Sequence, residues 1–277
     1  MVDRYPAARA PRDCDNTVAG VLAATRWIVE EAETGSARST QPTIGPSELG
    51  QPCDHCLAAR LAGWPKNREF AWLPWIGTAV HAKIAEAIET TNILKPEAML
   101  GKTSRFLVEK KVVVGHINGT PIKGSTDLFD TVTGAVIDWK IVGAQKLKSV
   151  KASGPGETYR AQAHLYGRGW HLADHQVNHV AIAFLPRNDM AGLAGAIYWT
   201  EPYQERIALD ALARAETIDR NLRILTAISI EARDAWITGL PRDPDCYDCA
   251  RHPDAPPTAL VAGLGGYEPH QVTAPIS

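Results

Sequence analysis

The sequence predicts an α/β fold in which helices flank a small mixed β-sheet. Two observations lead to this fold class. Short runs of apolar and β-branched residues, bounded by glycine or polar turns, recur between longer segments with helical periodicity. The chain has 277 residues, of which 45% are hydrophobic, so it can bury a substantial core as one large domain with appendages.

The individual elements follow from local patterns along the chain. Strands are expected at 106–117, 122–130, 135–142, 180–185 and 196–199. Helices are expected at 18–33, 75–91, 159–172 and 203–238. Asp15-Asn16-Thr17 would cap the first of these helices. A further helix is expected after the first cysteines, with Trp64 near its end. We divide the chain into an N-terminal helix with a flexible linker (1–46), a main domain (47–252) and a disordered tail (253–277).

Charge and hydropathy exclude some classes of protein. The net charge of −2 gives no overall sign of a nucleic-acid partner. No apolar run reaches membrane-spanning length and the N-terminus lacks a signal-peptide pattern, so we expect a soluble, cytoplasmic protein without a membrane partner. Locally, residues 139–170 contain six Lys or Arg against one acid, which fits either a solvated face or a track for phosphates.

The strongest chemical signal is a β-hairpin that carries Asp127, Asp138 and Lys140. The stretch 122–130 and the returning strand 135–142 are joined at Thr133-Gly134, which reads as a two-residue turn. Paired residue numbers in such a hairpin sum to an odd constant, and 127 and 138 sum to 265, so both aspartates share one face. Lys140 shares that face because side chains alternate with period two. Two carboxylates and a lysine suit a divalent metal and a phosphate.

A purely structural hairpin fits the same residues. An acid-x-lysine triplet arises by chance roughly once in a chain of this length, and Glu109-Lys110-Lys111 is a second example. A carboxylate pair at a buried edge without a metal would repel itself, and one member would have to stay protonated. The spacing alone leaves the two interpretations about equal.

Two helices add polar residues to this picture. Gly77-Thr78-Ala79-Val80-His81 opens one helix, and His81 lies beside its apolar stripe, where a histidine is more often a core residue than a ligand. Gln162 and Tyr166 are four apart and share a face of the helix at 159–172, which also fits an ordinary half-buried face.

Together, four motifs resemble the RecB-like branch of the PD-(D/E)XK nuclease superfamily, in particular the CRISPR-associated RecB-like exonucleases and their phage relatives. The motifs are Gly77-Thr78-Ala79-Val80-His81, Gly124-Ser125-Thr126-Asp127, Ile137-Asp138-Trp139-Lys140 and Gln162-Ala163-His164-Leu165-Tyr166. They occur in this order between about residues 47 and 249. The resemblance implies a restriction-endonuclease-like core and a metal-dependent DNA exonuclease, with DNA that has a free end as the partner and recombination or replication proteins as further partners.

The resemblance also implies roles for individual residues. His81, Asp127 and Asp138 would ligate one Mn²⁺ or Mg²⁺ ion, and an imidazole ligand suits manganese better. Lys140 would orient the attacking water or stabilise charge on the phosphate, and Gln162 and Tyr166 would position Lys140 or the nucleic-acid backbone. Glu109 stands at a strand start where relatives often carry a glutamate, which would allow it a supporting role at the metal beside these three ligands.

The cysteines predict a second metal centre. Cys53 and Cys56, with Cys246 and Cys249, form two Cys-x-x-Cys pairs, whereas Cys14 has no partner and reads as a free thiol. Two disulfides are not expected in a reducing compartment, and four thiolates bind zinc or an iron–sulfur cluster equally well by ligand count. Relatives hold a [4Fe–4S] cluster with one early and three late cysteines, and this chain departs from that pattern. We expect [4Fe–4S] or Zn²⁺, joining the N- and C-terminal segments.

Other residues near the cysteines leave alternatives open. His55 or His252 would be able to replace one cysteine ligand. Ser47-Glu48, with Arg60 after Cys56, resembles the opening motif of these nucleases, but Ser47 also fits a plain helix cap. At the level of function, the alternatives to the exonuclease are a catalytically inactive nucleic-acid-binding protein on the same fold and a metal-stapled interaction protein.

Overall fold

The computed structural model describes residues 10, 17–34, 44–65, 72–93, 104–243, 246, 248, 249 and 252. Cys14, the linker at 35–43 and the tail at 253–277 lie outside these residues, so the expectations for them remain predictions, as do the expected domain boundaries. The chain forms two compact units, residues 1–42 with 68–78, and residues 43–67 with 79–277. Among the described residues, no helix is long and apolar enough to cross a membrane.

The first unit contains helix α1 (Val18–Thr34) and the start of α4 (Trp72–Ile93). The hydroxyl of Thr17 accepts the Gly20 N–H at 3.1 Å, so the expected helix begins at its expected cap. In α4, Trp72 and Trp75 stack with ring centroids 5.2 Å apart.

The second unit is built on a five-stranded mixed sheet, which confirms the predicted fold class. Its strands are β1 (Phe106–Ile117), β2 (Thr120–Asp130), β3 (Ala135–Val142), β4 (His179–Pro186) and β5 (Ile197–Pro202). They are ordered β1-β2-β3-β4-β5, and only β3 and β4 run parallel. A parallel pair needs a crossover, and here α6 (Ala144–Ser153) and α7 (Glu157–Leu172) supply it.

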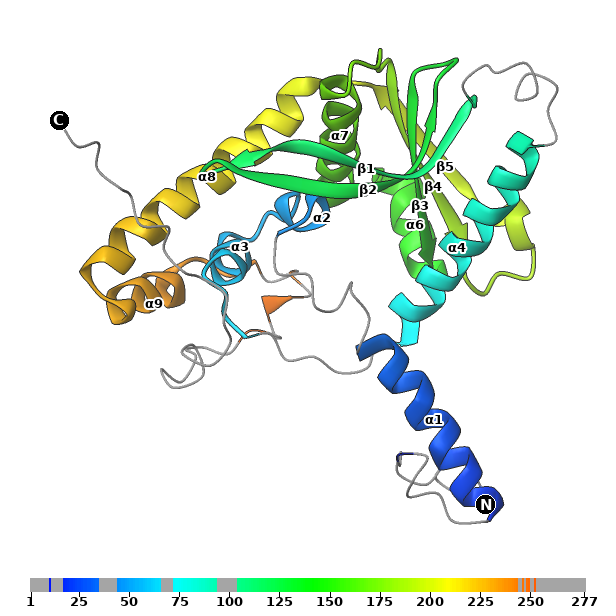
Figure 1. The fold of residues 1–277 in the computed structure, drawn as a ribbon, viewed down its shortest axis with the longest axis horizontal. Coiled ribbons are helices and arrows are strands. Elements are labelled where there is room, and N and C mark those ends of the chain that lie inside the picture. The colour runs from blue at the N-terminus through cyan, green and yellow to red at the C-terminus, as the bar shows by residue number, and fades with distance from the viewer. Residues whose placement is uncertain are drawn as a thin grey trace. The chain divides into compact units, whose positions relative to one another are not determined.

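Helices flank this sheet (Figure 1). Helices α2 (Pro46–Leu49) and α8 (Glu205–Ile228), together with α6, α7 and a short 3₁₀ turn, η2 (Gly192–Gly195), pack on its strands, whereas α3 (Asp54–Leu61) and α9 (Ile230–Gly239) pack on α8. Helix α7 packs on β1, β3 and β4, and its Trp170 stacks on Phe129 with centroids 4.5 Å apart. The indole N–H of Trp170 donates to the Thr126 hydroxyl at 3.2 Å, so the core fixes α7 against β2 just beside Asp127.

The hairpin β2–β3 keeps the predicted pairing but has a longer loop. Its residue pairs, such as Leu128 with Ile137, sum to the odd constant 265. The loop comprises residues 131–134 rather than two residues, and an even loop length preserves the parity of the pairing. The carboxylate of Asp130 closes the loop, because it accepts from the Val132 N–H and the Thr133 hydroxyl.

Three expectations for the helices need correction. The expected helix at 203–238 divides into α8 and α9 at Ser229, which is extended (φ −167°, ψ 160°) and caps α9 by accepting the Ala232 N–H. Helix α6 lies in the basic stretch at 139–170, ahead of the expected helix at 159–172, and is not predicted from the sequence. Trp64 lies beyond the end of α3 at Leu61, and its indole N–H donates to Asp234 at 3.0 Å.

Candidate functional site

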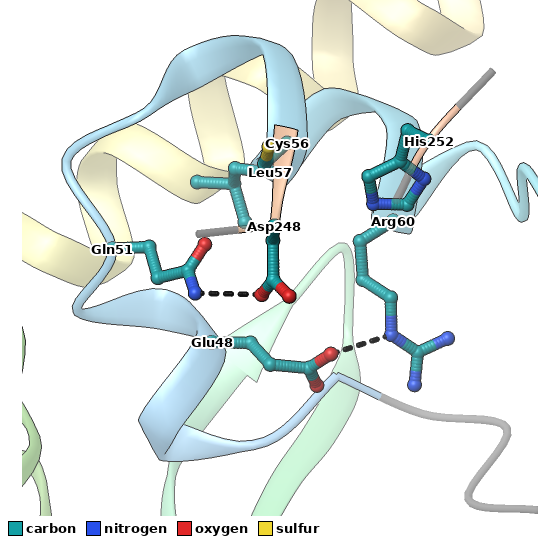
Figure 2. Close-up of a pocket in the computed structure, with 7 residues that line it drawn as sticks. All are labelled: Glu48, Gln51, Cys56, Leu57, Arg60, Asp248 and His252. Carbon is teal, nitrogen blue, oxygen red and sulfur yellow. Dashed lines mark hydrogen bonds and ion pairs between the residues drawn. The ribbon is translucent and has the colours of Figure 1, made fainter. Parts of the chain in front are cut away.

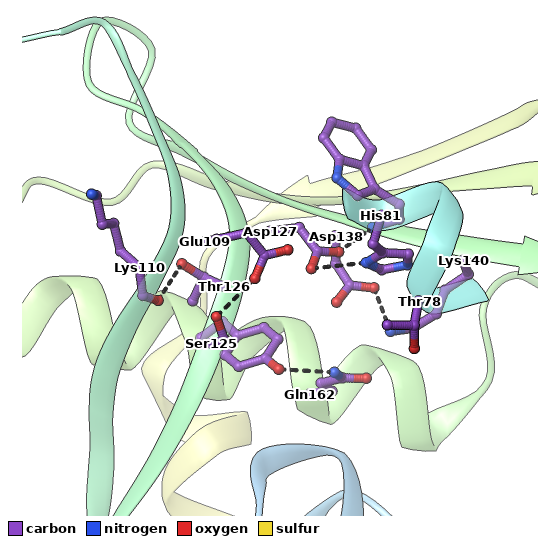
Figure 3. Close-up of polar contacts among 12 residues, drawn as sticks. Thr78, His81, Glu109, Lys110, Ser125, Thr126, Asp127, Asp138, Lys140 and Gln162 are labelled. Atoms are coloured by element: carbon purple, nitrogen blue, oxygen red, sulfur yellow. Dashed lines mark hydrogen bonds and ion pairs between the residues drawn. The ribbon is translucent and has the colours of Figure 1, made fainter. Parts of the chain in front are cut away.

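Helix α4 and strands β2 and β3 bring four of the predicted residues together. Figure 3 shows His81, Asp127, Asp138 and Lys140 pointing toward one another. His81 Nδ1 lies 3.2 Å from Asp127 Oδ1, although the two residues are 46 positions apart in the chain. The site therefore depends on how α4 packs beside the hairpin.

A hydrogen bond from the neighbouring strand β3 fixes the side chain of Asp127. Its Oδ2 accepts the backbone N–H of Trp139 at 2.7 Å, while Oδ1 faces His81. Asp127 directly precedes Leu128, where the pairing of β2 with β3 begins along the chain. Its side chain therefore accepts a backbone N–H of β3 that a backbone carbonyl of a longer ladder would otherwise bind. One carboxylate oxygen is thus fixed and the other remains directed into the site.

Asp138 and Lys140 form a close ion pair in the same site. Lys140 Nζ lies 2.6 Å from Asp138 Oδ2, and Asp138 is only 4% exposed. Burial raises the pKa of the Asp138 carboxyl, and so does the neighbouring Asp127, while Lys140 and His81 act against this shift. A cation between the two carboxylates would relieve their repulsion.

Glu109 joins the site through an irregularity in β1. Its φ is +49°, which is rare for a residue other than glycine, and the register between β1 and β2 skips Glu109 opposite Asp127. The carboxylate accepts from the Ser125 hydroxyl at 2.9 Å. One ligand atom each from His81, Glu109 and Asp127 lie within 4.8 Å of one another, so this donor set fits a divalent ion.

Among the described residues, this set contains two of the three predicted metal ligands. Glu109 is its third member, whereas the third predicted ligand, Asp138, pairs with Lys140. An imidazole with carboxylate oxygens suits Mn²⁺ and, less well, Mg²⁺. The only sequence signal for Glu109 is its position at the strand start noted above.

Gln162 lies beside this group on α7 (Figure 3), and Tyr166 follows one turn later on the same helix. Both are buried, and the amide of Gln162 donates to the Tyr166 hydroxyl at 3.2 Å. Gly124 allows this approach: a Cβ there would lie 2.7 Å from Tyr166 Cε1 and 2.6 Å from Pro46 Cγ. The glycine of the Gly-x-x-Asp motif is therefore a packing requirement of the site.

Tyr159 was not singled out in the sequence, yet it contacts the site lysine. Lys140 Nζ lies 5.3 Å from the centre of the Tyr159 ring, and Lys146 Nζ lies 5.1 Å from it. Both distances are within the range of cation–π attraction. The signal available in the sequence was the spacing of Tyr159 three residues before Gln162, on the same face of the helix.

The four predicted cysteines also come together, at a second place. Cys53 and Cys249 have sulfurs 3.3 Å apart, and Cys56 lies 3.3 Å from Cys249 and 3.5 Å from Cys246. Burial raises the pKa of Cys56, and it raises the pKa of Cys249 to about 11. For Cys53, backbone hydrogen bonds at Asp243 and Cys56 outweigh burial and lower the pKa. Such a group of thiols can hold a metal ion.

A small pocket adjoins the cysteines (Figure 2). It is lined by Glu48, Gln51, Cys56, Leu57, Arg60, Asp248 and His252. Glu48 pairs with Arg60 at 2.7 Å and accepts the Gly45 N–H, whereas the Gln51 amide donates to Asp248 at 2.8 Å. Gly45 is the N-cap of α2, so the interpretation of Ser47 as a helix cap is wrong. His55 and His252 are buried near the sulfurs, but the four cysteines form their group without them.

Comparison with known proteins gives structural similarity only. No family model and no curated protein matches the sequence. An alkaline exonuclease from Laribacter hongkongensis aligns with 72% of this chain and 96% of its own, at 12% identity and a TM-score of 0.43. A phage-related exonuclease from Haemophilus somnus 129PT aligns with 54% of this chain and 74% of its own, at 12% identity and a TM-score of 0.32. Both of these proteins are described as exonucleases.

Proposed function

We propose that this protein is a divalent-metal-dependent deoxyribonuclease that acts as an exonuclease on DNA with a free end. The observation that supports the proposal best is the convergence of His81, Asp127 and Asp138 with Lys140, where a buried carboxylate pair adjoins an imidazole and an ammonium group. A structural hairpin gains nothing from two buried carboxylates with the same charge. A phosphodiester hydrolase uses this combination.

His81, Asp127 and Glu109 would hold the ion, with Asp138 as a further ligand once its oxygen is shared between the metal and Lys140. The bound ion would polarise the scissile phosphate and lower the pKa of the attacking water. Lys140 then supplies a positive charge at the phosphate oxygens, where negative charge grows in the transition state. The backbone N–H of Trp139 keeps Asp127 in place throughout.

Helix α7 and the basic stretch before it would bind the substrate backbone. The hydrogen-bonded pair of Gln162 and Tyr166 would position Lys140 or the DNA backbone. Lys148 and Lys151 are exposed on α6, and Lys146 of the same helix lies against the Tyr159 ring. These lysines suit phosphates that continue from the scissile bond, and the affinity for DNA would fall with salt.

The test compares wild type with Asp138→Asn on two substrates, end-labelled linear single-stranded DNA and circular single-stranded DNA. Each reaction is run with Mn²⁺, with Mg²⁺ and with a chelator. Asp210→Asn is a matched control, because Asp210 is an exposed carboxylate on α8. We expect wild type and the control to degrade linear DNA only with metal, and Asp138→Asn to lose this activity. Cleavage of circles would instead identify an endonuclease. Retention of DNA by a folded wild type that never cleaves it would overturn the proposal in favour of a non-catalytic binding protein.

The four cysteines are proposed to hold a structural metal centre, and a cytoplasmic location remains part of the proposal. The centre would join residues that are up to 196 positions apart. Its two candidates, a zinc ion and an iron–sulfur cluster, differ in size.

A further inference from the structure

The spacing of the four sulfurs distinguishes between the two candidate centres. The three closest sulfur pairs are 3.3, 3.3 and 3.5 Å apart, and all four sulfurs lie within 4.8 Å of one another. Four thiolates about 2.3 Å from one tetrahedral zinc ion lie roughly 3.8 Å from each other. In a [4Fe–4S] cluster each thiolate binds a different iron, and the body of the cluster separates the sulfurs further. The observed group has the size of a shared single ion.

We propose that Cys53, Cys56, Cys246 and Cys249 hold one zinc ion, and that the cluster implied by the nuclease resemblance does not fit them. This inference rests on the proposed metal-binding role of the four cysteines and is independent of the proposed nuclease activity. The two-plus-two arrangement agrees with it, because paired Cys-x-x-Cys segments are a common way to complete a tetrahedral zinc site.

The first pair of cysteines is held by contacts that do not need a metal. Arg214 on α8 donates to the carbonyl oxygens of Gln51 and Pro52 and pairs with Asp54 at 2.7 Å. These three contacts bracket Cys53, which is the N-cap of α3. A wider cluster would require this segment to move away from α8, and it would break these charge-assisted hydrogen bonds.

The second pair is held by hydrogen bonds within its own segment. The Cys249 N–H donates to the Cys246 carbonyl, and the Cys246 N–H donates to Asp243, so the two sulfurs share one tight turn. Arg242 donates to the carbonyl of Cys249 at 3.2 Å. The Gln51 amide donates to Asp248 at 2.8 Å, so a contact that involves no sulfur also holds the two segments close to each other.

The test is the metal content of the full-length chain, produced in cells supplied with both iron and zinc and purified without oxygen. We expect one tightly held zinc per chain, neither iron nor acid-labile sulfide, and a colourless protein. Replacement of this zinc by Co²⁺ should give the sulfur-to-cobalt charge-transfer bands and intense visible bands of a tetrahedral thiolate site. An ion at the carboxylate site cannot give the charge-transfer bands, since it has no sulfur ligand.

Two variants test the assignment of the ligands. The double substitution Cys246→Ser with Cys249→Ser should abolish the tightly held zinc and the cobalt bands, and Cys14→Ser should keep both. Removal of zinc from wild type should lower the unfolding temperature by about 5–10 °C, and added zinc should restore it. If the double variant does not fold, the metal content and cobalt spectrum of wild type still decide.

Two results would overturn the inference. Iron and sulfide in equal amounts, with brown colour, would show a cluster and leave the metal staple itself intact. A folded chain that binds neither metal, or that joins these cysteines as disulfides, would overturn the staple as well. Neither result bears on cleavage of DNA, which is measured separately.

Discussion

The carboxylate of Asp127 accepts the backbone N–H of Trp139, the residue that separates Asp138 from Lys140, at 2.7 Å. This hydrogen bond links the two strands of the hairpin at the point where their side chains form the site. It leaves one oxygen of Asp127 facing His81, so in the proposed mechanism the same carboxylate has a structural role and a chemical role. Substitutions can separate the two roles.

Asp127→Asn should abolish cleavage without unfolding the protein. The amide oxygen of asparagine can still accept the Trp139 N–H, but the charge that binds the metal is lost, so we expect metal-dependent activity to fall by more than about 100-fold. Asp127→Ala should lose activity equally and also lower the free energy of unfolding by about 1–3 kcal/mol, because the N–H of Trp139 is left without a partner. Activity assays and urea denaturation measure the two effects. Equal stability of the two variants would contradict the structural role of Asp127.

Gly124→Ala should disturb the site through packing alone. The added methyl would lie within 2.7 Å of both Tyr166 and Pro46, so one of them has to move. We expect a loss of about 1–3 kcal/mol of stability and reduced cleavage, because the Tyr166 hydroxyl bonded to Gln162 is displaced. Gly239→Ala at the end of α9 is the matched control, since nothing lies within 4 Å of a Cβ there. Wild-type stability in Gly124→Ala would show that Tyr166 is not tightly packed against β2.

The sequence predicts the sheet and the central hairpin well, because both depend on local rules. The parity of 127 and 138 holds for any even loop, so the expectation that the aspartates share one face does not depend on the loop, which is longer than expected. The division of the long helix at Ser229 was missed because the apolar periodicity continues across it. The Ser229 hydroxyl accepts the Ala232 N–H, and this cap begins a new helix at that point.

The parts of the site that sequence could not specify depend on tertiary geometry. Glu109 reaches His81 and Asp127 through a kink with positive φ, which no local pattern announces in a glutamate. The cysteines were grouped correctly from their spacing, but the distances between sulfurs nearly two hundred residues apart exist only in the folded chain. Those distances favour a single metal ion.

Tyr159→Leu should slow cleavage because it removes the aromatic face beside Lys140. The ring also packs against Phe184, with centroids 5.9 Å apart, and leucine preserves much of this apolar contact. A lost cation–π interaction of about 0.5–2 kcal/mol corresponds to a roughly 2- to 30-fold lower rate. We expect the loss in kcat rather than in KM, and we expect Tyr159→Phe to restore the rate because it keeps the ring. An inactive phenylalanine variant would instead assign the role to the hydroxyl group.

His164 should make the protein less stable as the pH falls below neutrality. Burial lowers the pKa of His164, against the opposing effect of Glu201. The neutral ring fits its partners: Nδ1 accepts the Gln204 N–H at 3.2 Å, and Nε2 lies 2.5 Å from a Glu201 oxygen, to which it donates. Protonation of Nδ1 would place two donors face to face.

The pH range of this effect follows from the direction of the shift. A histidine whose pKa is lower in the folded state binds its proton more readily when unfolded. Its contribution to stability is therefore complete above the ordinary pKa of about 6.5 and is lost as the pH falls toward the folded-state value. We expect the urea midpoint of wild type to decrease between about pH 7 and pH 5. His164→Gln, whose amide can still donate to Glu201, should show a smaller decrease over this range, and equal slopes for the two proteins would assign the pH dependence to other groups.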